Sequence, residues 1–304
     1  VGRVLENFSL TTASVPEPGP GGYPSLLYRE GSVLFALNVE THDRIARSVL
    51  SRFMDPGDAG RFIDRTDRMY VRLYEETADG GNIRFEVIAR GAYPRRIAGF
   101  ALNRNGWTKK REPSVWWQAD EGGMQIAFPT SSMLLASSGG MESVLSRVRD
   151  PAGGKAIPDR LTAMMERSAM FVYGESPEFS GYFDRRIGTL ISKVRFFWMG
   201  FSAAEAQEPA PGAEAEPGAD APYTYGVDGE YRFEEESTAK SFLLSLRLAL
   251  LRRARQEGKE AILDLVEERY VTQEGSTVYI TGARMKADEM DLLFGIFMPQ
   301  IKRP

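Results

Sequence analysis

The sequence predicts an α+β fold made of two related β-α-β-β-α-β-like copies, with antiparallel or mixed sheets packed by helices. Two observations support this prediction. Segments with strand periodicity alternate with amphipathic helical segments along the chain. The order of these elements in residues 31–150 then recurs in residues 151–304. One mixed sheet without duplication is the alternative that the same pattern allows.

Two segments lack the pattern of a packed element. Residues 1–30 are rich in Pro and Gly, especially between Pro16 and Gly22, and are predicted to form an extended leader on the surface. Residues 203–222 consist almost wholly of Ala, Glu, Pro, Gly, Gln and Asp. Such a segment buries too little apolar surface to offset the entropy of ordering it, so it is predicted to be a disordered acidic loop within the second copy.

The first copy begins with an apolar strand at residues 32–37, which echoes the strand that opens the second copy at residues 168–173. Strands are recognised by alternating apolar residues and helices by apolar residues three or four apart. The other elements expected in the first copy are helices at 41–53, 95–103 and 141–148, and strands at 69–74, 83–89, 115–118, 124–128 and 132–136.

The second copy is expected to follow the same order. Ser176 and Pro177 are suited to a helix start, because Ser caps helices and Pro is tolerated at the first helical position. The elements expected after it are strands at 190–201, 225–233 and 277–280, and helices at 238–256 and 287–297.

Charge and hydropathy exclude several classes of protein. A formal net charge of −4 argues against a nucleic-acid-binding protein, which usually carries a basic surplus. The basic runs at residues 109–111 and 252–253 have acidic neighbours and indicate a solvated face. No run of eighteen apolar residues occurs in the chain, so the sequence predicts no transmembrane span.

The residues that usually perform catalysis or bind metals are scarce. The chain has no cysteine, which excludes disulfides, thiolate metal sites and cysteine nucleophiles. Its single histidine, His42, lies in the first turn of a predicted helix, where an exposed or capping role is expected. Zinc sites and serine hydrolases normally need further imidazoles or a Ser–His–acid set. We therefore expect no catalytic residue, no cofactor and no metal site.

Two motifs resemble known sites only in part. The aspartates at positions 55, 58, 64 and 67 lack the alternating spacing and the closing Glu of a calcium loop, and turn or cap roles are expected for them. Gly153-Gly154-Lys155 lacks the Ser or Thr and the preceding strand of a phosphate loop. Paired carboxylates are brought together by the fold, so a hydrolase with dispersed carboxylates stays open as a third functional alternative.

Three segments have unusually broad apolar surfaces. The strand at 196–201 is apolar on both faces, and the helical segments at 242–251 and 290–298 exceed the stripe of about 100° that a surface helix needs. Such faces are expected to be covered by the core, by a partner or by lipid, since burying one large apolar side chain contributes about 1.5–3 kcal/mol. The candidate contacts with lipid or a partner are Phe197, Met199, Phe201, Phe242, Leu246, Leu250, Leu293, Phe294 and Phe297.

Three short motifs, mainly within residues 32–148, resemble exported lipoproteins of spirochaetes, of the treponemal type. They are Gly91-Ala92-Tyr93-Pro94 after a strand, Gly106-Trp107 after a helix, and Trp116-Trp117 before the closing strands. The resemblance implies a lipidated cysteine upstream of Val1, a place at the inner leaflet of the outer membrane, and amphipathic helices that associate with lipid. It implies no catalytic activity. Because the chain begins at Val1 and not at Met, we expect an export signal or a lipid-bearing first residue to have been removed.

These observations predict a non-catalytic extracytoplasmic protein, in the periplasm or at the inner face of the outer membrane. Its expected partner is a membrane surface, an apolar ligand or another envelope protein, and not nucleic acid. The alternative is a structural or assembly module with a closed core. An apolar patch that stays exposed after the elements pack distinguishes the first hypothesis from the second.

Overall fold

The computed structural model describes residues 22–50, 56–76, 83–112, 114–119, 123–151, 155–177, 192–203, 224–257 and 270–286. The described strands are β1 (Val33–Asn38), β2 (Thr66–Glu75), β3 (Ile83–Gly91), β4 (Thr108–Lys110), β5 (Trp116–Gln118), β6 (Gln125–Thr130), β7 (Met133–Ser137), β8 (Met170–Glu175), β9 (Val194–Ala203), β10 (Thr224–Phe233), β11 (Val271–Glu274) and β12 (Thr277–Lys286). The described helices are α1 (Gly22–Leu27), α2 (Asp43–Leu50), α3 (Pro56–Ile63), α4 (Arg95–Arg104), α5 (Met141–Arg149), α6 (Asp159–Arg167) and α8 (Glu236–Glu257).

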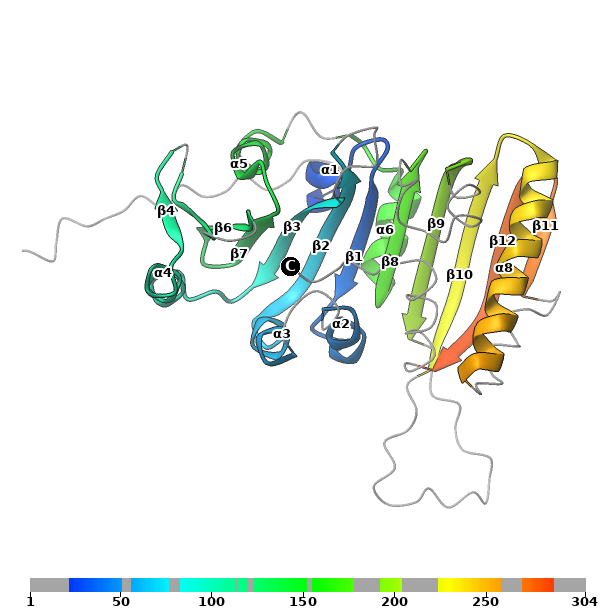
Figure 1. The fold of residues 1–304 in the computed structure, drawn as a ribbon, viewed down its shortest axis with the longest axis horizontal. Helices are drawn as coiled ribbons and strands as arrows, with labels where there is room; N and C mark the ends of the chain where they lie inside the picture. Colours follow the sequence, from blue (N-terminus) through cyan, green and yellow to red (C-terminus); the bar gives the residue numbers. More distant parts are fainter. Residues whose placement is uncertain are drawn as a thin grey trace, which may run out of the picture.

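The strands form one continuous twelve-stranded sheet in the order β11-β12-β10-β9-β8-β1-β2-β3-β7-β6-β5-β4. Every neighbouring pair is antiparallel. The predicted α+β class is confirmed, but the strands belong to one sheet where separate sheets were expected (Figure 1).

The strands that open the two predicted copies, β1 and β8, are neighbours at the centre of the sheet. Leu34 of β1 lies opposite Tyr173 of β8 in the antiparallel register. Read outward from β1 the order is β2, β3, β7, β6, β5 and β4, and read outward from β8 it is β9, β10, β12 and β11. The strand order therefore corresponds as far as β6 and β11, and β5 and β4 extend the sheet on the first side only.

Helices cover both faces of the sheet, and each face has its own apolar core. The buried residues of α2, α3 and α8 belong to one core, which Trp117 of β5 also joins. The buried residues of α1, α5 and α6 belong to the other core, with Trp116. Successive strand residues point to opposite faces, so adjacent tryptophans enter different cores.

Two expectations about the first half are wrong in detail. The end of the predicted extended leader is the helix α1, whose Leu26 and Leu27 are buried, and Tyr28 after it is buried as well. Apolar side chains in this short helix pack on β2, β3 and α5, which outweighs the Pro- and Gly-rich composition. The single helix expected at 41–53 is instead α2 followed by α3, which begins at Pro56 because proline fits a first helical turn.

Other expectations fall partly outside the described residues. Residues 1–21, the acidic loop beyond Ala203 as far as residue 223, and the helix expected at 287–297 lie there. Ala203 itself is the last residue of β9. Ser176, expected to begin a helix, follows β8 with a positive φ of 44°, and residues 178–191 are not described. Within the described ranges, no helix is both long enough and apolar enough to cross a bilayer.

Candidate functional site

Helix α4 is held on the sheet by contact between its Gly99 and the indole ring of Trp117. A Cβ atom on residue 99 would lie 2.8 Å from Cζ2 of Trp117, closer than carbon atoms normally approach. Trp117 Nε1 also donates a hydrogen bond of 2.9 Å to Oδ1 of Asn103, one helical turn further along α4. Together these contacts determine which side of α4 faces the sheet.

The opposite side of α4 exposes two large apolar residues. Ile97 and Phe100 are 71% and 70% exposed, while Ala98 and Leu102 pack against the core. Residues three positions apart lie on the same helix face, so Ile97 and Phe100 form a pair. Four of the six large apolar side chains exposed in the described ranges lie within residues 97–124, the other two of these four being Val115 and Met124.

This apolar pair lies in a segment of one charge. Residues 95–111 contain six basic residues and no Asp or Glu, although the whole chain carries a net charge of −4. Strand β4 lies beside α4 at one end of the sheet (Figure 1), which adds the basic run at 109–111 to the arginines of the helix. We call Ile97, Phe100 and the exposed cations Arg95, Arg96, Arg104, Lys109, Lys110 and Arg111 the α4 patch.

Helix α8, at the other end of the sheet, has a similar but weaker outer face. Leu244 and Leu248 are 61% and 57% exposed. Lys240 and Arg252 extend the same row by one turn at each end, and both are exposed. We call these four residues the α8 row.

The apolar residues selected from the sequence mostly belong to the core. In this structure Met199, Phe201, Phe242, Leu246 and Leu250 are buried, and Phe197 is partly buried, with its ring stacked on that of Tyr231 at 5.6 Å. Leu293, Phe294 and Phe297 lie outside the described residues. The large apolar residues that are exposed are different ones, and two of them, Leu244 and Leu248, lie on α8 together with the buried Leu246.

The α4 patch was missed because Ile97 and Phe100 give α4 an ordinary apolar stripe. The sequence nevertheless contains one signal for it, the unbroken basic character of residues 95–111 around two large apolar residues. Taken alone, the run at 109–111 indicates only a solvated face, and the signal requires the arginines of the neighbouring helix as well.

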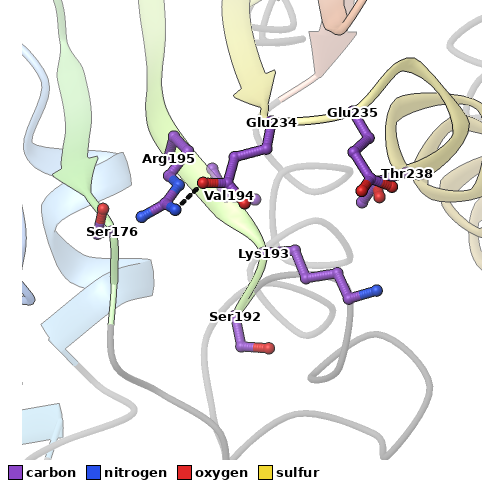
Figure 2. A pocket seen from close by; sticks show the side chains of 8 residues that line it. All are labelled: Ser176, Ser192, Lys193, Val194, Arg195, Glu234, Glu235 and Thr238. Carbon is purple, nitrogen blue, oxygen red and sulfur yellow. Dashed lines mark hydrogen bonds and ion pairs between the residues drawn. The ribbon is translucent and has the colours of Figure 1, made fainter.

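A cavity of about 370 Å³ lies where β9 begins and α8 starts (Figure 2). Its charged lining is balanced, because Arg195 forms an ion pair with Glu234, and Lys193 and Glu235 add one charge of each sign. The remaining lining residues are Ser176, Ser192, Val194 and Thr238. A balanced lining selects no charged ligand, so the cavity supports no assignment.

His42 and the aspartate-rich segment are the residues that the sequence offers for catalysis or metal binding. Burial lowers the pKa of His42, whose ring makes an edge contact with Tyr225 at a centroid distance of 5.9 Å. Asp64, from the aspartate-rich segment, pairs with Arg47 at 3.3 Å. Within the described ranges, no group of three or more His, Cys, Asp or Glu side chains is placed to hold a metal ion.

Comparison with known proteins finds similarity at the level of the fold. No family model matches the chain, and no curated protein matches it. Crystal form IV of TP0453, a treponemal protein, has a TM-score of 0.57 at 13% identity, covering 91% of this chain and 97% of TP0453. Form III gives 0.59 at 12%, covering 93% and 98%, and form I gives 0.59 at 11%, covering 92% and 99%. The chain therefore shares the fold of TP0453 over nearly its whole length.

Proposed function

We propose that this protein is a non-catalytic, extracytoplasmic protein that associates with an anionic lipid surface through the α4 patch. The shared fold with a treponemal protein and the resemblance to spirochaetal lipoproteins support a place in the cell envelope, in the periplasm or at the inner face of the outer membrane. The observation that carries the proposal is the exposed pair Ile97 and Phe100 within a segment that contains only basic charges.

The α4 patch has the composition of a helix that lies in a membrane interface. Such a helix inserts its apolar face among the acyl chains while Lys and Arg side chains meet the headgroups. Full burial of a large apolar side chain contributes about 1.5–3 kcal/mol, so burying the exposed part of Ile97 and Phe100 contributes about 2–4 kcal/mol together. Each cation near an anionic surface adds about 1 kcal/mol.

The α8 row is a second, weaker contact in this proposal. It shares its sheet face with α4 but lies near β10, β11 and β12. Neighbouring strands rotate by roughly 20–25° each, so two helices at opposite ends of a twelve-stranded sheet do not face one plane. We therefore assign the principal contact to the α4 patch, which has the greater exposure and charge.

The alternatives receive less support. A module with a closed core leaves no reason for Ile97 and Phe100 to stay in water at 71% and 70% exposure. A hydrolase needs carboxylates that converge on an open site, and the cavity at the start of α8 instead places Glu234 in an ion pair with Arg195.

Liposome flotation tests the proposal. The purified chain without any acyl group should float with vesicles of phosphatidylcholine and phosphatidylglycerol, and should not float with phosphatidylcholine alone. Replacing Ile97 and Phe100 by Ser should weaken the partition by roughly 30- to 700-fold, the equivalent of about 2–4 kcal/mol. The unfolding midpoint should stay unchanged, because both side chains are exposed.

The matched control replaces Leu244 and Leu248 of the α8 row by Ser, which removes the same kind of exposed apolar area elsewhere. This variant should keep most of its flotation. A parent chain that does not float with anionic vesicles, or equal losses in the two double variants, contradicts the assignment to the α4 patch.

We also infer an internal repeat in which β8, β9, β10, α8 and β12 correspond to β1, β2, β3, α4 and β7. Its support is the corresponding strand order and the position of each helix directly after the third strand of its half. Superposition of the four strands of one half on those of the other tests this, and non-equivalent strand positions contradict it.

A further inference from the structure

A buried carboxylate on the sheet face covered by α1 and α5 is held by two arginines. Oε2 of Glu86, on β3, accepts a hydrogen bond of 3.1 Å from Arg72 on β2 and one of 2.6 Å from Arg147 on α5. The side chains of Glu86, Arg72 and Arg147 are 4%, 13% and 16% exposed. Arg72 is further fixed by stacking over the ring of Tyr74, at 4.2 Å from the ring centroid.

A third guanidinium, that of Arg29, is close enough to Arg72, Arg147 and Glu86 for their charges to act on it. Nη1 of Arg29 donates to the backbone oxygens of Ser25 and Tyr28, which anchors the side chain at the end of α1. Arg29 is partly exposed and forms no ion pair with a carboxylate in the described ranges. We call Arg29, Arg72, Arg147 and Glu86 the arginine cluster.

The arginine cluster has a surplus of positive charge. Burial lowers the pKa of the Arg29 guanidinium, the positive charges of Arg147 and Arg72 lower it further, and Glu86 offsets only part of this. The Nε atoms of Arg72 and Arg147 are buried and lack an acceptor in the described part of the chain. Unpaired donors of charged groups are costly in a partly desolvated place, so one further anion would stabilise the cluster.

We propose that the arginine cluster binds a phosphate group, with Arg29 as the residue that completes the site. Guanidinium groups present planar pairs of N–H donors that match phosphate oxygens, and several of them suit a compact anion of more than one charge. The carboxylate of Glu86 neutralises only one of the three guanidinium charges, so the positive charge that remains suits one phosphate group.

The bound phosphate belongs to a soluble molecule and not to a lipid headgroup in this proposal. The cluster lies under α1 and α5, whereas the α4 patch lies on the opposite face of the sheet. The site is therefore independent of the membrane contact proposed above, and either proposal can fail without the other.

Isothermal titration of the full chain with inorganic phosphate, at ionic strength held constant with chloride, tests the site. We expect saturable binding with one phosphate per chain. Arg29→Gln should weaken it about tenfold or more, the size expected for one charge-assisted hydrogen bond. Arg149→Gln, two residues from Arg147 on the same helix but exposed, removes the same charge and should leave the affinity unchanged.

Glu86→Gln provides a test of opposite sign, because it removes the carboxylate that competes for the same guanidiniums. This variant should bind phosphate more tightly than the parent chain. Titration with short-chain phosphatidate below its micelle concentration distinguishes the two sources of phosphate. Binding of phosphatidate without binding of inorganic phosphate overturns the soluble source of the phosphate. The site itself is overturned if the heat of binding does not saturate with phosphate, or if Arg29→Gln and Arg149→Gln lose the same amount of phosphate affinity.

Discussion

The contact between Gly99 and Trp117 predicts that Gly99→Ala destabilises the parent protein but stabilises a variant in which Trp117 is replaced by Phe. Gly99→Ala places a Cβ atom 2.8 Å from Cζ2 of Trp117. Carbon atoms pack at about 3.5–4.0 Å, so helix or ring must retreat by roughly 1 Å. Overpacking of this kind costs about 1–3 kcal/mol, and the helix propensity of Ala returns about 1 kcal/mol. We expect a net loss of about 1 kcal/mol in the free energy of unfolding.

In a Trp117→Phe background the same substitution should stabilise the protein by about 0.5–1 kcal/mol. Phe has no atoms at Cζ2 and Cη2, the positions nearest to the new Cβ, so only the gain in helix propensity remains. Urea unfolding followed by far-ultraviolet circular dichroism measures all four chains of the double-mutant cycle. The coupling free energy should be about 1.5–2 kcal/mol, within the range found for residues in contact.

Ala101→Gly provides the control, since Ala101 is exposed on the same helix. It should cost about 1 kcal/mol in both backgrounds, because only helix propensity changes. The reasoning is refuted if Gly99→Ala has the same effect in both backgrounds to within about 0.5 kcal/mol. Helix α4 would then not be seated on the indole ring, and the outward direction of Ile97 and Phe100 would lose its explanation.

Two further predictions concern the second half of the chain. Leu246→Ala should cost about 2–5 kcal/mol of unfolding free energy, because Leu246 is only 5% exposed. Leu248→Ala should change the unfolding free energy by no more than about 0.5 kcal/mol, because Leu248 is 57% exposed. Urea unfolding measures both variants, and equal costs would contradict the orientation of α8. Burial alone would raise the pKa of Glu175, but hydrogen bonds of 2.5 Å from Lys155 and 2.6 Å from Tyr173 outweigh it, so the folded pKa lies below 4.5. This carboxylate therefore stabilises the fold above pH 4.5, and its contribution is lost as pH falls through its folded pKa. Glu175→Gln should lower the unfolding free energy at pH 7 and reduce the fall in unfolding free energy between pH 5 and 3. An unchanged dependence of the unfolding free energy on pH would show that the contact is not made.

The sequence by itself determined most of the individual elements. Alternating apolar residues predicted strands at 83–89 and 225–233, where β3 and β10 lie, and helical spacing predicted helices at 95–103 and 238–256, where α4 and α8 lie. These patterns are local, because a side chain's face depends on the periodicity of its own element. The absence of cysteine and the single histidine likewise limited the available chemistry without any structure.

Only the tertiary structure decided how the elements combine. Whether β1 and β8 join in one sheet depends on pairing between residues far apart in the chain, for which local periodicity contains no information. Both faces of α8 are apolar in sequence, and packing on β10, β11 and β12 selected Leu246 for the core and left Leu248 exposed. The arginine cluster joins residues 29, 72, 86 and 147 from four elements or their ends. Such a site exists only once the strands are in register and the helices are seated, because its charges act over a few ångströms of space and not along the chain.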